Sequence, residues 1–480
     1  MANALTARKG IDTIVEEGGK AGLSKTLGKV SITAMGIGAI IGAGIFVLTG
    51  TAAARYAGPG IMISFILGGI ACSFVGLCYS ELAALLPVSG STYTYAYATM
   101  GELVAWIIGW DLILEYAAGS ATVAVGWSGY FVSLLKSLGF SFPKILSAAP
   151  GSPVTLADGS HAHALFNLPG AAIVVLITLL LIGGTKESTR LNTIMVAVKL
   201  MVVLAFVGVG AFFVHTGNWF PVIPANKGSF GAYGWSGILR GAGVVFYAYI
   251  GFDAVSTAAQ EAKHPQTDMP VGILASLLIC TLLYIAVAGV MTGIVPYAKL
   301  NVSDPIAIAT DAIGIGWFSL LIKIGTLVGL TTVILVFLYG QSRIFYTMAH
   351  DGLLPESFAR LHPRLQTPYR SQAMIGACVA LVAALVPITV LGEMVSIGTL
   401  FAFILVCGAV IRLRQTDGRM KRPFRVPGVP WVPVLGILCC LTLMAGLPLA
   451  TWVRLVVWLG IGLAVYFGFG RHHSKLQRQD

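Results

Sequence analysis

The chain has 480 residues, of which 57% are hydrophobic and only 10% are charged. A soluble protein of ordinary composition carries roughly 25% charged residues, so the composition excludes a soluble globular protein and indicates a polytopic membrane protein. The formal net charge is +11, and the placement of the basic residues along the chain indicates membrane topology instead of nucleic-acid binding.

Residues 1–29 are polar and contain Asp12, Glu16 and Glu17. The apolar run that follows them is too long for the core of a signal peptide. We therefore expect a cytoplasmic N-terminal tail that leads into a first membrane-spanning helix.

Windows of about 20 apolar residues predict twelve membrane spans, with boundaries defined to within a few residues. The fold class that they predict is an all-α polytopic membrane protein. The spans are expected at residues 30–54, 61–86, 98–132, 169–185, 191–214, 236–259, 271–295, 314–348, 373–390, 394–412, 430–449 and 452–470.

The lysines and arginines predict the orientation of these spans. With the N-terminus in the cytoplasm, about two thirds of the 30 basic residues fall on the cytoplasmic side, as the positive-inside rule requires. Both termini are therefore expected in the cytoplasm. The net positive charge then serves as a topology signal and as a contact for anionic lipid.

The first predicted span contains Gly36, Gly38, Gly42 and Gly44 within nine positions. Each glycine costs about 1 kcal/mol relative to alanine inside a helix, so the pattern predicts a helix that is interrupted near its middle. The freed carbonyls can accept from an ammonium group, and the N–H groups near Ala43, Gly44 and Ile45 can bind a carboxylate. The alternative is close helix packing through small residues.

A second interruption is predicted in the sixth span, at Tyr247-Ala248-Tyr249-Ile250-Gly251. This segment offers backbone carbonyls and aromatic walls. Asp253 is expected to cap the half-helix that restarts behind it, and the alternative is that it binds the substrate. A pair of interrupted helices in two halves of a membrane protein points to the binding site of a transporter.

Two acidic residues fall inside the third span. Glu115 lies near its middle, where an ionisable residue costs about 2.5–3.5 kcal/mol and is expected to face the interior of the bundle. It either attracts a cationic group of a substrate or makes a structural hydrogen bond to a neighbouring helix. Asp111 lies one turn earlier.

Lys199 lies in the fifth span, roughly 12 Å along the helix from its expected cytoplasmic edge. Desolvation favours the neutral amine, so Lys199 is a candidate for coupling transport to protons. Two alternatives remain, a charged strut that binds carbonyls of a broken helix and a side chain that snorkels to the interface.

The eighth span contains a lysine and two adjacent threonines. Lys323 is expected to snorkel toward the outer interface. Thr331 and Thr332 either bind a sodium ion or donate to carbonyls of their own helix. We expect no metal site and no cofactor, because the histidines and cysteines show no ligand spacing.

Four segments resemble the cationic amino acid transporter family of the amino acid–polyamine–organocation superfamily, in its prokaryotic form. They are Gly36 to Phe46, the Pro87-Val88-Ser89-Gly90-Ser91-Thr92-Tyr93-Thr94-Tyr95 run, Tyr249 to Asp253, and the Arg343 to Pro355 segment. The resemblance covers nearly the whole chain. It implies two inverted repeats of five helices with discontinuous first and sixth helices, followed by two further helices.

The resemblance also implies roles for particular residues. Glu115 would face the substrate, and the ammonium of Lys199 would occupy the place of a sodium ion, which implies proton coupling or sodium independence. The proposed substrate-binding residues, with Gly42 and Tyr249 included from the pattern itself, are Ile40, Gly42, Ala43, Gly44, Glu115, Tyr247, Ala248, Tyr249 and Ile250.

The sequence thus predicts a secondary transporter, not an enzyme, that imports cationic or small neutral L-amino acids across a bacterial inner membrane by alternating access. Its partners would be the amino acid, protons and membrane lipid, with no nucleic acid, and its oligomeric state is open. A sodium-independent uniporter or exchanger and an amino-acid-sensing receptor on the same fold are the alternatives. The predicted parts are a tail (1–29), the two repeats (30–215 and 236–414), the last two helices (430–471) and a C-terminal tail (472–480).

Overall fold

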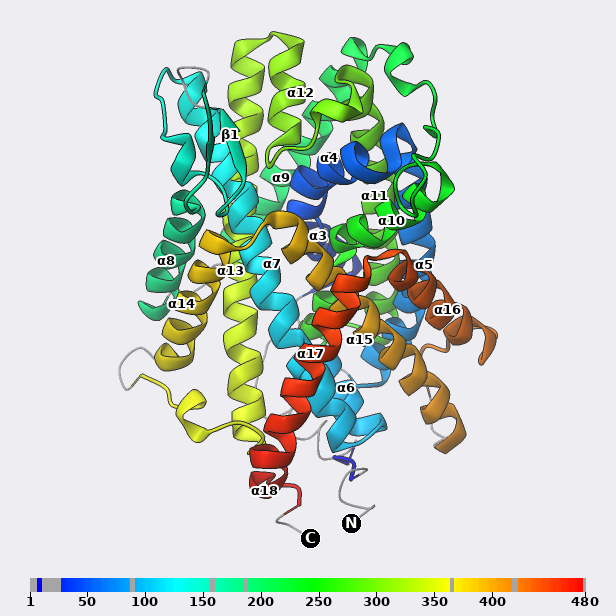
Figure 1. The fold of residues 1–480 in the computed structure, drawn as a ribbon. Coiled ribbons are helices and arrows are strands. Elements are labelled where there is room, and N and C mark those ends of the chain that lie inside the picture. The colour runs from blue at the N-terminus through cyan, green and yellow to red at the C-terminus, as the bar shows by residue number, and fades with distance from the viewer. Residues whose placement is uncertain are drawn as a thin grey trace.

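The computed structural model of the chain describes residues 7–10, 27–86, 91–155, 160–184, 189–362, 367–416 and 422–477. In this part the chain is almost entirely helical (Figure 1). One antiparallel pair of short strands, β1 (Pro153–Thr155) and β2 (His161–His163), lies in the connection between the third and fourth predicted spans.

Seven helical stretches of the described chain are long and apolar enough to cross a membrane, which confirms the predicted fold class. Four shorter apolar helices also coincide with predicted spans, while the total of twelve spans stays a prediction. The longer helices are α5 (Ile61–Leu85), α7 (Glu102–Ser137), α9 (Thr189–Gly210), α11 (Pro265–Ile294), α13 (Gly316–His350), α15 (Ile388–Thr416) and α17 (Leu449–Val465). The shorter helices are α3 (Lys29–Ile40), α4 (Thr49–Ala52), α6 (Ser91–Thr99), α8 (Leu168–Ile182), α10 (Gly234–Val245), α12 (Pro305–Ile313), α14 (Tyr369–Leu385), α16 (Trp431–Gly446) and α18 (Arg471–His473).

The third predicted span began too early. We expected it to run over residues 98–132, but Gly101 adopts φ 103° and separates α6 from α7. A positive φ ends a right-handed helix, and glycine adopts it without steric cost. The helix therefore starts at Glu102 and extends to Ser137.

The first interruption occurs where the glycines predict it. Helix α3 ends at Ile40, and Ile41 has an extended backbone with ψ 103°. A π-helical segment, Gly44–Leu48, and then α4 continue the chain in a new direction. The glycine-rich sequence lowers the cost of ending the helix here, because glycine stabilises a helix less than other residues do and little helix stability is lost.

The second interruption follows α10. A 3₁₀ segment, Phe246–Tyr249, leads to Ile250 with ψ 138° and to Gly251 with φ 114°. A further 3₁₀ segment, Ala254–Glu261, precedes α11. Both interruptions predicted from the sequence are therefore present, and both lie among buried residues.

The neighbouring helices pack around the two interruptions. Helix α11 contacts both α3 and α5, α13 contacts α7 and α9, and α15 contacts α7. Helices α7 and α15 are mostly buried, whereas less than a third of the apolar windows of α9 and α17 is buried. An apolar outer surface around a buried centre is the arrangement expected for a bundle in lipid.

We expect Gly251→Ala to destabilise the protein. A side chain at φ 114° is strained, and its Cβ would lie 2.6 Å from the carbonyl oxygen of Ala39. The expected loss in free energy of unfolding is about 1–3 kcal/mol, measurable as a lower Tm in detergent. Gly460→Ala in α17 is the matched control, because a Cβ there meets no atom within 4 Å. An equal Tm for both variants would contradict the assigned backbone conformation.

Candidate functional site

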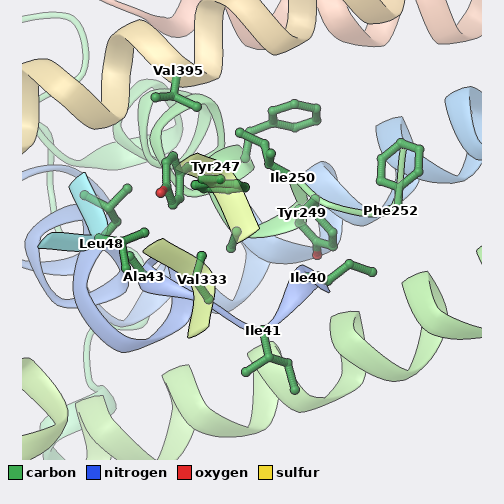
Figure 2. Packing of buried hydrophobic residues seen from close by; sticks show 14 of the residues in the cluster. Ile40, Ile41, Ala43, Leu48, Tyr247, Tyr249, Ile250, Phe252, Val333 and Val395 are labelled. Carbon is green, nitrogen blue, oxygen red and sulfur yellow. The ribbon is translucent and has the colours of Figure 1, made fainter. Parts of the chain in front are cut away.

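The two interruptions pack directly against each other. A Cβ on Gly44 would overlap the backbone of Ala248, so only glycine permits this approach. Ile40, Ala43, Tyr247 and Ala248 are all buried there (Figure 2). The structure thus brings together the predicted residues of the first and the sixth spans.

Helix ends leave backbone N–H and C=O groups without partners inside the helix. Two helices that end at the same buried place therefore concentrate such groups around one small volume. The amino and carboxylate groups of an amino acid are complementary to them, since carbonyls accept from an ammonium and helix N-termini attract a carboxylate. The arrangement is chemically suited to a zwitterion.

Tyr284 on α11 connects the two interruptions. Its hydroxyl lies 2.8 Å from the carbonyl oxygen of Ile40 and 2.9 Å from that of Ala248. The hydroxyl has a single hydrogen, so it donates to one of the two carbonyls at a time. Sequence reasoning missed this residue, and the available signal was a single phenol in a predominantly apolar span.

Lys199 binds the first broken helix. Its Nζ donates to the carbonyl oxygen of Gly38 at 3.0 Å, and the side chain is buried. Its aliphatic stem packs close to Gly329 of α13. The geometry matches the predicted strut, and Lys199 makes no salt bridge to any carboxylate in the described chain.

The tyrosines of the second interruption hold it to its neighbours. Tyr247 donates to the carbonyl oxygen of Gly119 in α7 at 3.2 Å, and Tyr249 donates to that of Phe65 in α5 at 2.7 Å. Both hydroxyls are thus directed at flanking helices. The apolar faces of the two rings contribute to the buried cluster around Ile250 (Figure 2).

Asp253 binds the interruption itself. Its Oδ1 accepts from the N–H of Gly251 at 3.1 Å, while its side chain makes no capping bond to the segment Ala254–Glu261. The predicted cap is therefore wrong, because the carboxylate binds an N–H that precedes it in the chain and not one in the segment that follows it. The reason is that Gly251, with its positive φ, presents its N–H to a carboxylate two residues later.

Glu115 lies buried on α7, close to Thr399 of α15. Asp253 and Asp111 are its electrostatic neighbours. Asp111 is also buried, and both of its carboxylate oxygens lack a hydrogen-bond partner among the described residues. This side of the site is therefore acidic.

The structure corrects one prediction for the eighth span. Lys323 does not snorkel but is buried and binds Asp311 at 2.8 Å and Ser137 at 2.7 Å. A paired ammonium avoids the cost of a buried isolated charge. Thr331 and Thr332 donate to Leu327 and Gly329 of their own helix, both at 2.7 Å, as one of the two alternatives predicts.

Part of one motif cannot be placed. Residues 87–90 lie outside the described chain, and so do most residues of the predicted tail 1–29. Among the residues that the structure does describe, no group of three histidine, cysteine, aspartate or glutamate side chains is arranged to hold a metal ion.

A family profile described as amino acid permease matches residues 27–467. The chain belongs to the amino acid permease family. This amino acid permease is therefore a multi-pass membrane transporter and not an enzyme, and its family supports amino acid transport.

Several relatives of this amino acid permease match it over most of their length. A branched-chain amino acid permease of Bacillus subtilis is 48% identical over 480 residues, which is all of both chains. A methylthioribose transporter of the same organism is 44% identical over 476 residues, covering 99% of this chain and all of that one. The vacuolar cationic amino acid transporter 4 of Arabidopsis thaliana is 37% identical over 423 residues, 87% of this permease and 68% of the plant protein.

We expect Tyr284→Phe to loosen the contact between the two interruptions. The change removes the one donor that the carbonyls of Ile40 and Ala248 share, at a cost of about 1–3 kcal/mol. The measurement is Tm in detergent together with the affinity for an amino acid substrate. Tyr339→Phe is the control, since its hydroxyl only accepts from the exposed Arg343. Unchanged Tm and affinity in Tyr284→Phe would contradict the bridging role.

Proposed function

We propose that this permease is a secondary transporter that carries L-amino acids by alternating access. The substrate would bind where the two interruptions meet. The observation that supports this most directly is the contact between Gly44 and Ala248, with Tyr284 bonded to both broken helices. Unwound backbone at membrane depth is tolerated only where protein buries it or where it lines a cavity.

The proposed site combines backbone groups with apolar walls. Ile40, Gly42, Ala43 and Gly44 would bind the substrate from the first interruption, and residues 247–250 from the second. Hydrogen bonds to the main-chain atoms of the substrate would fix its orientation. The side chain of the substrate would then point at the surrounding walls.

For the substrate we propose a neutral L-amino acid with a branched apolar side chain. The buried side chains of Ile40, Ile250 and Val333 around the interruptions favour an apolar group (Figure 2). The name of the relative that is 48% identical agrees with this choice.

A cationic amino acid is the second candidate. Glu115 and Asp253 place two carboxyl groups near the second interruption. The plant relative that is 37% identical is named as a cationic amino acid transporter. Uptake of radiolabelled isoleucine into proteoliposomes, with leucine, arginine and methylthioribose as competitors, separates the candidates. Competition by arginine or methylthioribose but not by leucine would contradict the proposed substrate.

We further propose that transport is coupled to protons through Lys199 and is independent of sodium. The ammonium already donates to Gly38 within the first broken helix, so loss of its proton would weaken a contact that holds this helix in place. Binding of a proton and the position of α3 would thus be linked.

The proposed architecture has two inverted repeats, at 30–215 and 236–414, in the plasma membrane with both termini in the cytoplasm. The positions of the interruptions in α3 and after α10, early in each half, support the repeats. Residues near both ends of the chain bind Glu102. Its N–H donates to the carbonyl oxygen of Ala7, and its carboxylate accepts from the side-chain amide of Gln477. Both ends therefore lie on one face, in agreement with the charge distribution.

We expect Lys199→Ala to abolish accumulation of substrate in response to an imposed pH gradient, because the variant has no group at this place that gains and loses a proton. Exchange of internal for external substrate should persist. The measurement is uptake into proteoliposomes with and without the gradient, and with sodium replaced by choline. Lys323→Gln, another buried lysine, is the control and should still accumulate substrate.

Other outcomes of this experiment distinguish the alternatives. Accumulation of substrate by Lys199→Ala would contradict the coupling role. Lys199 would then have only the structural role of binding the carbonyl of Gly38. Exchange without accumulation in the unmodified protein would indicate an exchanger or uniporter. Binding without any movement of substrate would indicate a receptor.

We expect Glu115→Gln to weaken binding of arginine more than binding of isoleucine. Loss of a charged hydrogen-bond acceptor costs about 1.5–3 kcal/mol, which is roughly tenfold to a hundredfold in affinity. The affinity for isoleucine in the same variant serves as the internal control. Unchanged affinity for both amino acids would place Glu115 outside the site.

A further inference from the structure

A cavity of about 300 Å³ lies away from the interruptions, where α13 ends and the C-terminal segment returns. His350 and Arg360 line it from the α13 side, and Phe469, His473 and Lys475 line it from the C-terminal side. Nothing in the proposed transport mechanism uses this cavity. Its volume is sufficient for a small ligand or a headgroup.

The lining of this cavity is basic. Arg360 and Lys475 are basic, exposed, and without a salt bridge in the described chain. Glu356 is the one carboxylate in the lining, so Arg360 and Lys475 together leave one net positive charge. The rings of His350 and His473 stack on Tyr346 and Phe469 and are held at the rim.

The C-terminal wall of the cavity is fixed by a buried carboxylate. Glu102, at the start of α7, is fully buried. Its Oε1 accepts from Tyr466 at 2.9 Å and from Gln477 at 2.6 Å, and its Oε2 accepts from Tyr97 at 2.9 Å and from the hydroxyl of Ser474. These donors come from α6 and from the C-terminal segment, so one carboxylate joins the two.

The backbone connects the same segment to the end of α13. The N–H of Lys475 donates to the carbonyl oxygen of Asp351 at 3.1 Å, and Gly352 packs against His473 so closely that a Cβ would overlap it. A ligand in the cavity would therefore contact a segment whose next residues bind Glu102.

The cavity lies at the end of the helical stretch Leu449–His473. Val456, Val457, Ile461 and Phe467 of this stretch are exposed and form an apolar surface. In a membrane protein such a surface faces lipid tails, and a basic site just beyond it lies at the level of the headgroups. Basic pockets next to spanning helices on the cytoplasmic side bind anionic headgroups.

We propose that this cavity binds a phosphate group, carried by an anionic lipid or by a free phosphate, and that binding orders the C-terminal segment on Glu102. Arginine offers a planar pair of donors to phosphate oxygens, and lysine offers a compact charge. Helix α7 begins at Glu102 and carries Glu115, and α6 contacts the segment Ala254–Glu261 beyond the second interruption. A phosphate group bound in the cavity would thus favour one arrangement of α6, α7 and the segment Ala254–Glu261.

The test is hydrogen–deuterium exchange of the peptide covering residues 466–477 in the full-length protein, purified in an uncharged detergent. Dioleoylphosphatidylglycerol, dioleoylphosphatidylcholine and inorganic phosphate are added separately. We expect the phosphatidylglycerol or the inorganic phosphate to slow exchange by about tenfold, the effect of one charge-assisted contact. Phosphatidylcholine should have no such effect.

Variants connect the effect to the cavity. The double change Arg360→Gln and Lys475→Gln should remove the protection, while the charge-preserving change Arg360→Lys with Lys475→Arg should retain at least part of it. Arg370→Gln, an exposed arginine at the start of α14 outside the cavity, is the control and should respond like the unmodified protein. Glu102→Gln should weaken protection of the tail while lipid or phosphate is still bound, as native mass spectrometry would detect.

The outcomes separate the two sources of phosphate. Protection by phosphatidylglycerol alone supports a lipid site, and protection by inorganic phosphate supports a soluble ligand. No protection by either, or equal protection of the double variant and of Arg370→Gln, would overturn the proposal. None of these readouts depends on transport, so the proposed function can fail independently.

Discussion

Backbone groups released at a helix end must find partners when no water is present. Each unsatisfied group buried in apolar surroundings costs about 1–3 kcal/mol, which is a large fraction of the stability of a protein. This permease interrupts two helices at the same buried place, and side chains from neighbouring helices and from the second interruption itself satisfy released groups. The bonds are those of Lys199 to Gly38, Tyr284 to Ile40 and Ala248, Tyr130 to Phe46, and Asp253 to Gly251.

The side chains that bind these backbone groups differ in how easily each hydrogen bond can be exchanged for another. A neutral hydrogen bond contributes about 0.5–1.5 kcal/mol net, so a phenol can leave one carbonyl for another at a modest cost. Tyr284 lies within reach of two carbonyls and has one hydrogen to donate. In the proposed site, a substrate ammonium would bind one of these carbonyls while Tyr284 keeps the other. Tyr284 thus holds the two interruptions together through a hydroxyl that can change its acceptor.

The sequence predicted those features that depend on local composition. Glycine spacing located both interruptions, and apolar windows located the helices, because each signal acts within one or two turns. Features that depend on distant partners were missed or wrong. Lys323 was expected to snorkel because its partner Asp311 lies in the preceding helix, α12, and the sequence does not show how α12 packs against α13. Tyr284 and Glu102 were missed for the same reason, since their partners are up to several hundred residues away.

Helix α7 connects the regions that these bonds define. At its start, Glu102 accepts hydrogen bonds from α6 and from the C-terminal segment. Near its middle, Glu115 is buried and the carbonyl of Gly119 accepts from Tyr247. Farther along, Tyr130 donates to Phe46 at the end of the first interruption. Because a helix is a rigid element, α7 holds these contacts at fixed distances from one another. The buried charges on α7 are thus better understood as one set, placed along a rigid element that contacts both broken helices.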